Sequence, residues 1–68
     1  MEGIVKWFKD DLGYGFIAAE GRDYFAHFSE ISHEGFKSLR EGDKVFFNPE
    51  TAPKGLIARQ IQKEFSHD

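Results

Sequence analysis

Residues 6–28, with the sequence KWFKDDLGYGFIAAEGRDYFAHF, decide the fold of this chain. Seven of the eleven aromatic side chains (one Trp, two Tyr and eight Phe in all) lie in this window. Most of them fall in two short runs, GYGFI at 13–17 and YFAHF at 24–28. Aromatic and β-branched residues in runs of this length are typical of strands, and the glycines between them are typical of turns.

Alternation along the two runs decides which rings share a face. Side chains on a strand point alternately to its two sides, so Tyr14 and Phe16 share one face of the first run. Phe25 and His27 share one face of the second run, with Tyr24 on the other. If the runs pair, one face carries four rings, and a domain this small cannot bury both faces. We therefore expect one aromatic face to stay in water and to stack on unpaired bases.

Runs of β-branched and aromatic residues on either side of residues 6–28, separated by glycine-containing turns, predict further strands. The expected strands cover residues 2–9, 14–19, 23–28, 44–50 and 56–64, with a 3₁₀ turn at 29–31. Val5 and Trp7 would share a face under strict alternation, so we expect a bulge or a strong twist that keeps Val5 inside while Trp7 reaches the surface. A second irregularity is expected at Arg59, a polar residue on an apolar face. Five short strands with almost no helix predict an all-β, five-stranded antiparallel barrel.

The expected interior consists of the apolar residues on the inward face of each strand. These are Val5, Ile17, Tyr24, Ala26, Ile31, Val45, Phe47, Ile57 and Ile61. One of Phe36 and Leu39 should also plug the core, and Phe36 is the candidate to remain exposed. Gly15 has two readings, a sharp bend in the barrel or the close approach of a ligand.

Length and composition set the class of protein. Sixty-eight residues predict a single domain, 1–68, with 65–68 as a frayed tail. The chain has no cysteine, no apolar run long enough to cross a membrane and no apolar targeting segment, so we expect a soluble, cytoplasmic protein without membrane partners. The net charge of −3 argues mildly against nucleic-acid binding, but Lys6, Lys9 and Lys37 lie close to aromatic residues.

The residues indicate binding rather than catalysis. No nucleophile–base pair or pair of carboxylates stands in an aromatic context, so we expect no enzyme, no catalytic residues, no cofactor and no small-molecule substrate. No second histidine lies at ligand spacing from His27, which we interpret as a stacking ring rather than a metal ligand.

Four motifs in this order resemble the cold-shock domain family, over almost the whole chain from residue 3 to about residue 63. They are KWF (6–8), GYGFI (13–17), YFAHF (24–28) and GFKSL (35–39) followed by Glu41-Gly42. The resemblance implies an OB-type barrel that binds single-stranded RNA and DNA, and a role as a nucleic-acid chaperone or transcription antiterminator.

The resemblance also implies the binding residues. The stacking rings would be Trp7, Tyr14, Phe16, Phe25, His27, Phe28 and Phe36, and the polar or charged contacts would be Lys6, Asp23 and Lys54. From its place beside an aromatic residue, we also expect Lys37 to contact a phosphate of the bound strand. This chain departs from the family at Leu12, where a lysine is usual, and at Leu56-Ile57, where the family is more polar.

Other interpretations remain open at this point. Exposed rings on a small barrel also suit a peptide-binding module that cradles a polyproline segment. A monomer is expected, although the long segment at 29–40 leaves a strand-exchanged dimer open.

Overall fold

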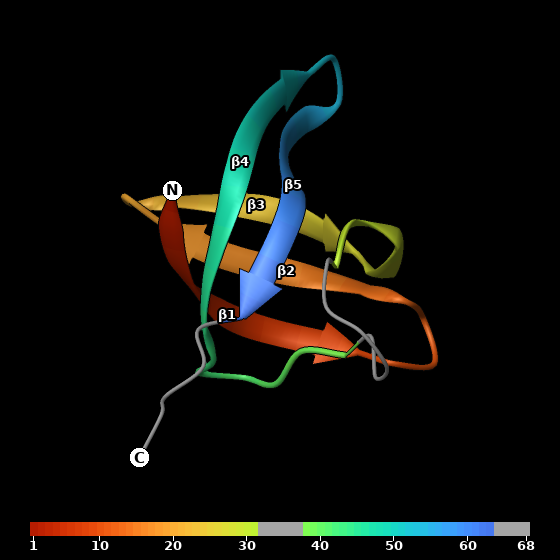
Figure 1. Cartoon of the computed structure of the whole chain (residues 1–68). Helices are drawn as coiled ribbons and strands as arrows, with labels where there is room; N and C mark the ends of the chain where they lie inside the picture. Colours follow the sequence, from red (N-terminus) through yellow and green to blue (C-terminus); the bar gives the residue numbers. More distant parts are fainter. Residues whose placement is uncertain (32–37, 64–68) are drawn as a thin grey trace.

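The computed structural model describes residues 1–31 and 38–63. Its elements, in chain order, are β1 (Glu2–Lys9), β2 (Tyr14–Ala19), β3 (Arg22–His27), the 3₁₀ helix η1 (Phe28–Glu30), β4 (Lys44–Ala52) and β5 (Gly55–Lys63) (Figure 1). The expected strands are thus all present, with ends shifted by one or two residues. Phe36, Lys37 and the expected tail lie outside the described residues.

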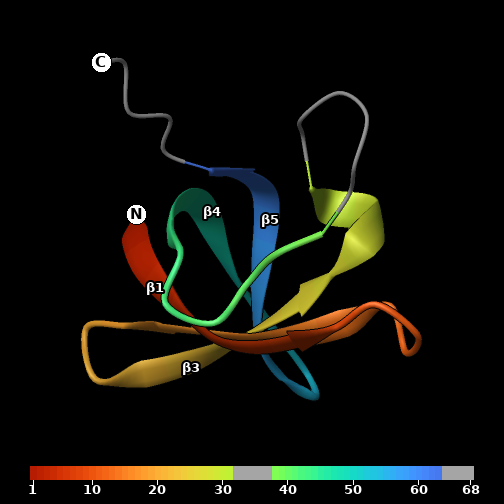
Figure 2. The ribbon, with the colours of Figure 1, turned by 90° about the horizontal axis from the view of Figure 1, so that it is seen from below.

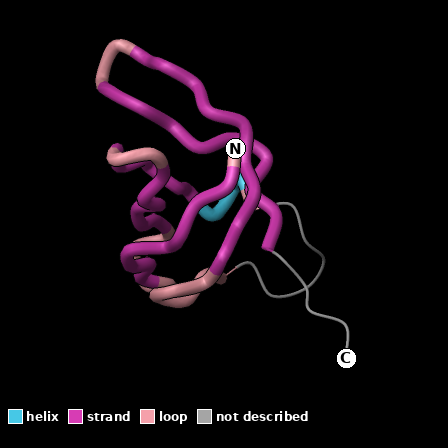
Figure 3. The backbone as a smooth tube through the Cα atoms, turned by 90° about the vertical axis from the view of Figure 1, so that its left-hand side faces the viewer, coloured by secondary structure: helices cyan, strands magenta, loops and turns pink. Residues whose placement is uncertain are grey.

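The five strands close into a barrel in the order β1-β2-β3-β5-β4. The β1–β2–β3 meander forms one layer, which the β4–β5 hairpin crosses (Figure 2). The far end of the hairpin extends beyond the other three strands (Figure 3). All neighbours are antiparallel except β3 and β5, which pair in parallel at Phe25 and Ile57. The expected five-stranded antiparallel barrel is confirmed except at this one seam, because a closed ring with an odd number of strands cannot alternate direction throughout.

The core contains the expected residues with one exception. The buried side chains are Val5, Ile17, Ala19, Tyr24, Ala26, Ile31, Leu39, Val45, Phe47, Ala58 and Ile61. Tyr24 and Phe47 meet at its centre with ring centroids 5.0 Å apart. Leu39 plugs the barrel, as one of the two candidates was expected to do.

Ile57 is the exception, because it is only half-buried and Ala58 takes the inward position. Between the pairs Asn48–Arg59 and Phe46–Gln62, β5 uses one residue more than β4. Gln60 takes the extra place with φ 52°, in the left-handed region. The bulge shifts the alternation, so that Ala58 and Ile61, three residues apart, both face the core. The irregularity expected near Arg59 is confirmed, but its effect on the inward face was not foreseen.

The expected bulge in β1 is also confirmed. The register with β2 shifts between Val5 and Trp7, which leaves Lys6 as the extra residue. Val5 is buried and Trp7 reaches the outer face, half-buried. Gly15 lies opposite Phe8, and a Cβ on Gly15 would fall 2.6 Å from the Phe8 Cα and closer still to the Trp7 carbonyl oxygen. Of the two readings of Gly15, the structure supports the bend, because the β1 backbone occupies the space of a side chain.

Candidate nucleic-acid interface

Six rings form a continuous surface, five of them on the outer face of β1, β2 and β3 and the sixth at the start of η1. We call this surface the aromatic platform; its members are Trp7, Tyr14, Phe16, Phe25, His27 and Phe28. Neighbouring ring centroids lie between 4.7 and 6.3 Å apart. These spacings are those of aromatic groups in direct contact.

Strand register explains why these rings meet. Phe16 lies opposite Trp7 of β1 and opposite Phe25 of β3, and Tyr14 lies opposite His27. Directly opposed residues on one face have Cβ atoms about 5 Å apart, which brings large rings into contact. The five strand rings are half-buried, and Phe28 at the end is 45% exposed. The four rings expected on one face from alternation are thus brought together, with Trp7 joining them through the β1 bulge.

The His27 ring is oriented by the residue two positions later. The backbone N–H of Ser29 donates to His27 Nδ1 at 3.2 Å, and Ser29 Oγ lies 2.8 Å from the same nitrogen. Because Nδ1 accepts a hydrogen bond from the backbone, the proton of the neutral ring lies on Nε2. His27 therefore offers both a flat ring and an N–H donor at the end of the platform.

The two polar contacts implied for Lys6 and Asp23 pair with each other in this structure. Lys6 Nζ donates to Asp23 Oδ2 at 3.1 Å, with both side chains about half exposed. Such a pair contributes only about 0–1 kcal/mol in water, so a ligand can separate it at little cost. Among the described residues, neither Lys9 nor Lys54 forms an ion pair with a carboxylate.

A hollow of about 450 Å³ adjoins the platform at the β4–β5 hairpin. Its lining residues are Phe16, Asp23, Phe25, Lys54, Gly55, Leu56 and Ile57. This hollow brings Lys54, remote in sequence, next to two platform rings. Leu56 and Ile57 were not among the expected site residues, although their departure from the family pattern was a signal. Their apolar side chains make this wall suited to the face or methyl group of a base.

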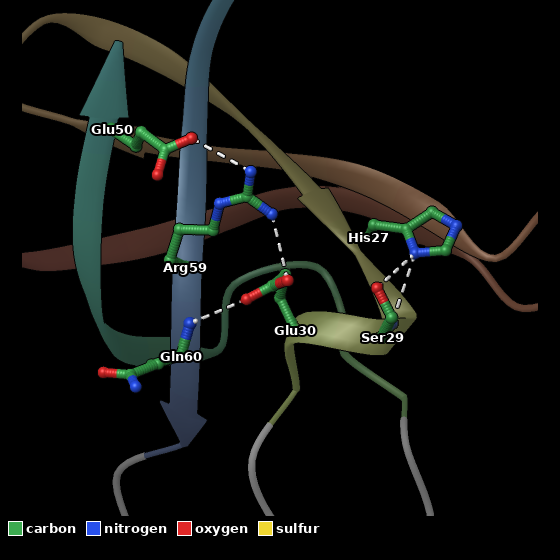
Figure 4. Close-up of polar contacts among 6 residues, drawn as sticks. All are labelled: His27, Ser29, Glu30, Glu50, Arg59 and Gln60. Atoms are coloured by element: carbon green, nitrogen blue, oxygen red, sulfur yellow. Dashed lines mark hydrogen bonds and ion pairs between the residues drawn. The ribbon is translucent and has the colours of Figure 1, made fainter. Parts of the chain in front are cut away.

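A group of charged side chains joins η1, at the His27–Phe28 end of the platform, to β5 and β4. Arg59 donates from Nη1 to Glu30 Oε2 at 3.0 Å and from Nη2 to Glu50 Oε2 at 2.9 Å (Figure 4). The hydrogen bond and positive charge of Arg59 hold the pKa of Glu50 below its usual value. The hydrogen bonds that Arg59 donates to the two carboxylates, first to Glu50 and then to Glu30, raise the pKa of Arg59. Sequence reasoning marked Arg59 only as an irregularity in β5, because its partners lie far away in sequence.

Within residues 1–31 and 38–63, no group of three or more His, Asp or Glu side chains is arranged to hold a metal ion. No helix among the described residues is long and apolar enough to span a membrane. Phe36 and Lys37, the two remaining expected contacts, lie outside the described residues.

Comparison with known proteins identifies the family of this chain. The family model of the 'cold-shock' DNA-binding domain matches residues 1–64. The cold shock-like protein CspA of Bordetella pertussis is 55% identical over 62 residues, which cover 88% of this chain and 92% of that protein. The cold shock protein CspC of Bacillus subtilis is 51% identical over 63 residues, covering 91% and 96%. The major cold shock protein of Micrococcus luteus is also 51% identical over 63 residues, covering 90% and 94%. With the family model matched over nearly its whole length, the chain belongs to the cold-shock domain family, whose members bind nucleic acids and are not enzymes.

Proposed function

We propose that this protein binds single-stranded RNA and DNA by stacking unpaired bases on the aromatic platform. The observation that carries the proposal is the unbroken contact of six partly exposed rings across three strands. A ring in water gains free energy when a base covers it, and every base has a flat face. The mechanism is therefore largely independent of base sequence.

The expected affinity follows from the number of rings. Each stacked base contributes about 1–3 kcal/mol by alanine substitution. Four stacked bases would give micromolar or better affinity after the costs of ordering the strand. Because stacking needs few cations, the net charge of −3 is compatible with binding. Only about two to four phosphates should be neutralised, by cations such as Lys6, Lys9 and Lys54, so the affinity should fall gently with salt.

Titration of Trp7 fluorescence with a hexathymidine oligonucleotide tests the proposal. Trp7 is the only tryptophan, so its quenching reports directly on the platform. Phe16→Ala and Phe25→Ala should each weaken binding by about 1–3 kcal/mol. Phe46→Ala is the matched control, since Phe46 is 40% exposed but lies on β4, where it pairs with Glu2.

Two outcomes would count against the proposal. Equal weakening by Phe46→Ala and Phe16→Ala would show that the platform is not the binding surface. Quenching by a proline-rich peptide but not by the oligonucleotide would favour the peptide-binding alternative.

We extend the proposal to a chaperone or antiterminator role. A protein that binds only the open strand shifts a hairpin's equilibrium toward the open form by mass action. A fluorophore–quencher RNA hairpin should therefore brighten as protein is added, and the Phe16→Ala variant should require a higher concentration. A hairpin that stays closed at protein concentrations that saturate hexathymidine would exclude this role while leaving binding intact.

A further inference from the structure

The bulge in β5 presents two hydrogen-bond donors to the 3₁₀ helix. The extra residue at Gln60, with φ 52°, interrupts the regular pairing of β5 with β4. The backbone N–H of Gln60 donates instead to Glu30 Oε1 at 3.3 Å. Arg59, the residue before it, donates to the other oxygen of the same carboxylate. The bulge thus supplies neighbouring donors that match the two oxygens of one side chain.

Glu30 is held on both oxygens and is largely shielded from water. Its side chain is 24% exposed, less than either of its charged neighbours in the group. Arg59 is itself held from the other side by Glu50 of β4 (Figure 4). The three side chains therefore tie η1 to β5 and β4 at once. Charge-assisted hydrogen bonds of this kind are stronger than hydrogen bonds between neutral groups.

The tied helix carries the end of the aromatic platform. Phe28 is the first residue of η1 and Glu30 is its last. The middle residue, Ser29, holds the His27 ring through Nδ1. On the opposite side, the Phe28 N–H donates to the Gly13 carbonyl at 2.9 Å. A change in the orientation of η1 would therefore move the His27 and Phe28 rings, whose centroids lie 4.7 Å apart.

We propose that Arg59 is a positioning residue, which holds η1 through Glu30 so that the His27 and Phe28 rings are already placed for stacking. The inference rests on the proposed function. Both Nη atoms of Arg59 are engaged by carboxylates, so it acts through the rings and does not neutralise a phosphate. Rings placed in advance lose less freedom when a base covers them, which strengthens binding.

A double-mutant cycle tests this assignment. Arg59→Met removes the charge and keeps most of the aliphatic stem, and it should weaken hexathymidine binding by about two- to tenfold. In a Phe28→Ala background the same substitution should have a clearly smaller effect, because part of what Arg59 positions is gone. Arg59→Lys should restore part of the affinity, since lysine can still pair with Glu30. The dependence of affinity on salt should match that of the wild type.

Lys63→Met is the matched control. Lys63 also lies on β5 and pairs with Asp43 at 3.2 Å, with both side chains less than one-third exposed. Losing this ion pair removes a similar contact without touching η1, so the affinity should be unchanged. If Arg59→Met does not fold, Glu30→Gln removes the same charge pairing from the other side and should weaken binding in the same Phe28-dependent way.

Three results would overturn the assignment. The first is unchanged affinity of Arg59→Met for hexathymidine, and the second is that Arg59→Met loses as much affinity in the Phe28→Ala background as in the wild type. The third is a salt dependence of Arg59→Met that is shallower than that of the wild type by about one unit, which would mark a direct contact between Arg59 and a phosphate. Failure of the wild type to bind hexathymidine would instead refute the proposed function. The two failures are thus distinguished in one set of titrations.

Discussion

Replacing Gly15 with alanine should disturb both the barrel and the platform. The φ of Gly15 lies outside the left-handed region, so lack of space rather than backbone conformation requires glycine. The new Cβ would lie 2.6 Å from the Phe8 Cα, and its three nearest neighbours, this atom and the Trp7 carbonyl carbon and oxygen, are all main-chain atoms. None of them can rotate away, so β1 must move by roughly 1 Å to restore van der Waals contact.

The size of the effect follows from two opposing contributions. Inserting a methyl group into a filled space usually costs about 1–3 kcal/mol. Alanine also reduces the freedom of the unfolded chain, which stabilises the fold by about 0.4–1 kcal/mol. The overpacking is the larger contribution, and we expect a net loss of about 1–2 kcal/mol. Urea unfolding followed by Trp7 fluorescence would measure it.

The same substitution should also weaken oligonucleotide binding. Moving β1 displaces Trp7, whose ring lies 5.5 Å from Phe16 and 5.9 Å from Tyr14. Gly3→Ala is the matched control, because a Cβ there meets Ile17, Ala18 and Phe47 in the core, away from the platform. It should lower stability but leave the affinity of the folded protein unchanged. Wild-type stability and affinity in Gly15→Ala would refute the inference that β1 presses against Gly15.

Three further experiments test other parts of the structure. Leu12, 51% exposed in the turn before β2, should accept lysine, and Leu12→Lys should raise affinity at low salt and steepen the salt dependence by about one unit. An unchanged slope would show that position 12 does not approach phosphate. Ile61→Ala should lower the free energy of unfolding by about 2–5 kcal/mol, because Ile61 is fully buried, and Ile57→Ala by clearly less. Equal losses would contradict the shifted alternation of β5. Arg59 lowers the pKa of Glu50 in the folded protein, so this ion pair stabilises the fold at any pH above the pKa that Glu50 has in the unfolded chain. The stabilisation is lost as the pH falls through the lower pKa that Glu50 has in the folded protein. Thermal melts should therefore show Glu50→Gln less stable than wild type at neutral pH and the difference disappearing in acid, whereas a constant difference would mean that the charge of Glu50 is not involved.

Much of the barrel could be predicted because local patterns and tertiary structure agree. Alternation assigned Tyr14 and Phe16 to the outer face, and Ile17 and Tyr24 to the core, without any information on contacts. An irregularity in β1 could be predicted because strict alternation gave two mixed faces, and of the two possibilities, a bulge or a strong twist, the structure shows the bulge. These features depend on residues that are near one another in the chain.

The remaining features depend on contacts between distant segments. Ile57 seemed to be a core residue because alternation was counted back from Ile61, and the Gln60 bulge between them reverses that count. The ion pair between Lys6 and Asp23 joins strands whose lateral register is invisible in a single sequence. The parallel seam between β3 and β5 is a consequence of barrel closure, not of any residue in either strand.

The two bulges explain how a short barrel can expose so many rings and remain folded. In β1, the extra residue at Lys6 turns Trp7 outward while Val5 stays in the core. In β5, the extra residue at Gln60 turns Ile61 inward, and the freed N–H of Gln60 binds Glu30 beside Arg59. One bulge adds a ring to the platform and the other, on our inference, steadies its far end. A variant of β5 without the extra residue would leave Ile61 or Ala58 facing water, so the packing of the core and the support of η1 cannot be varied independently.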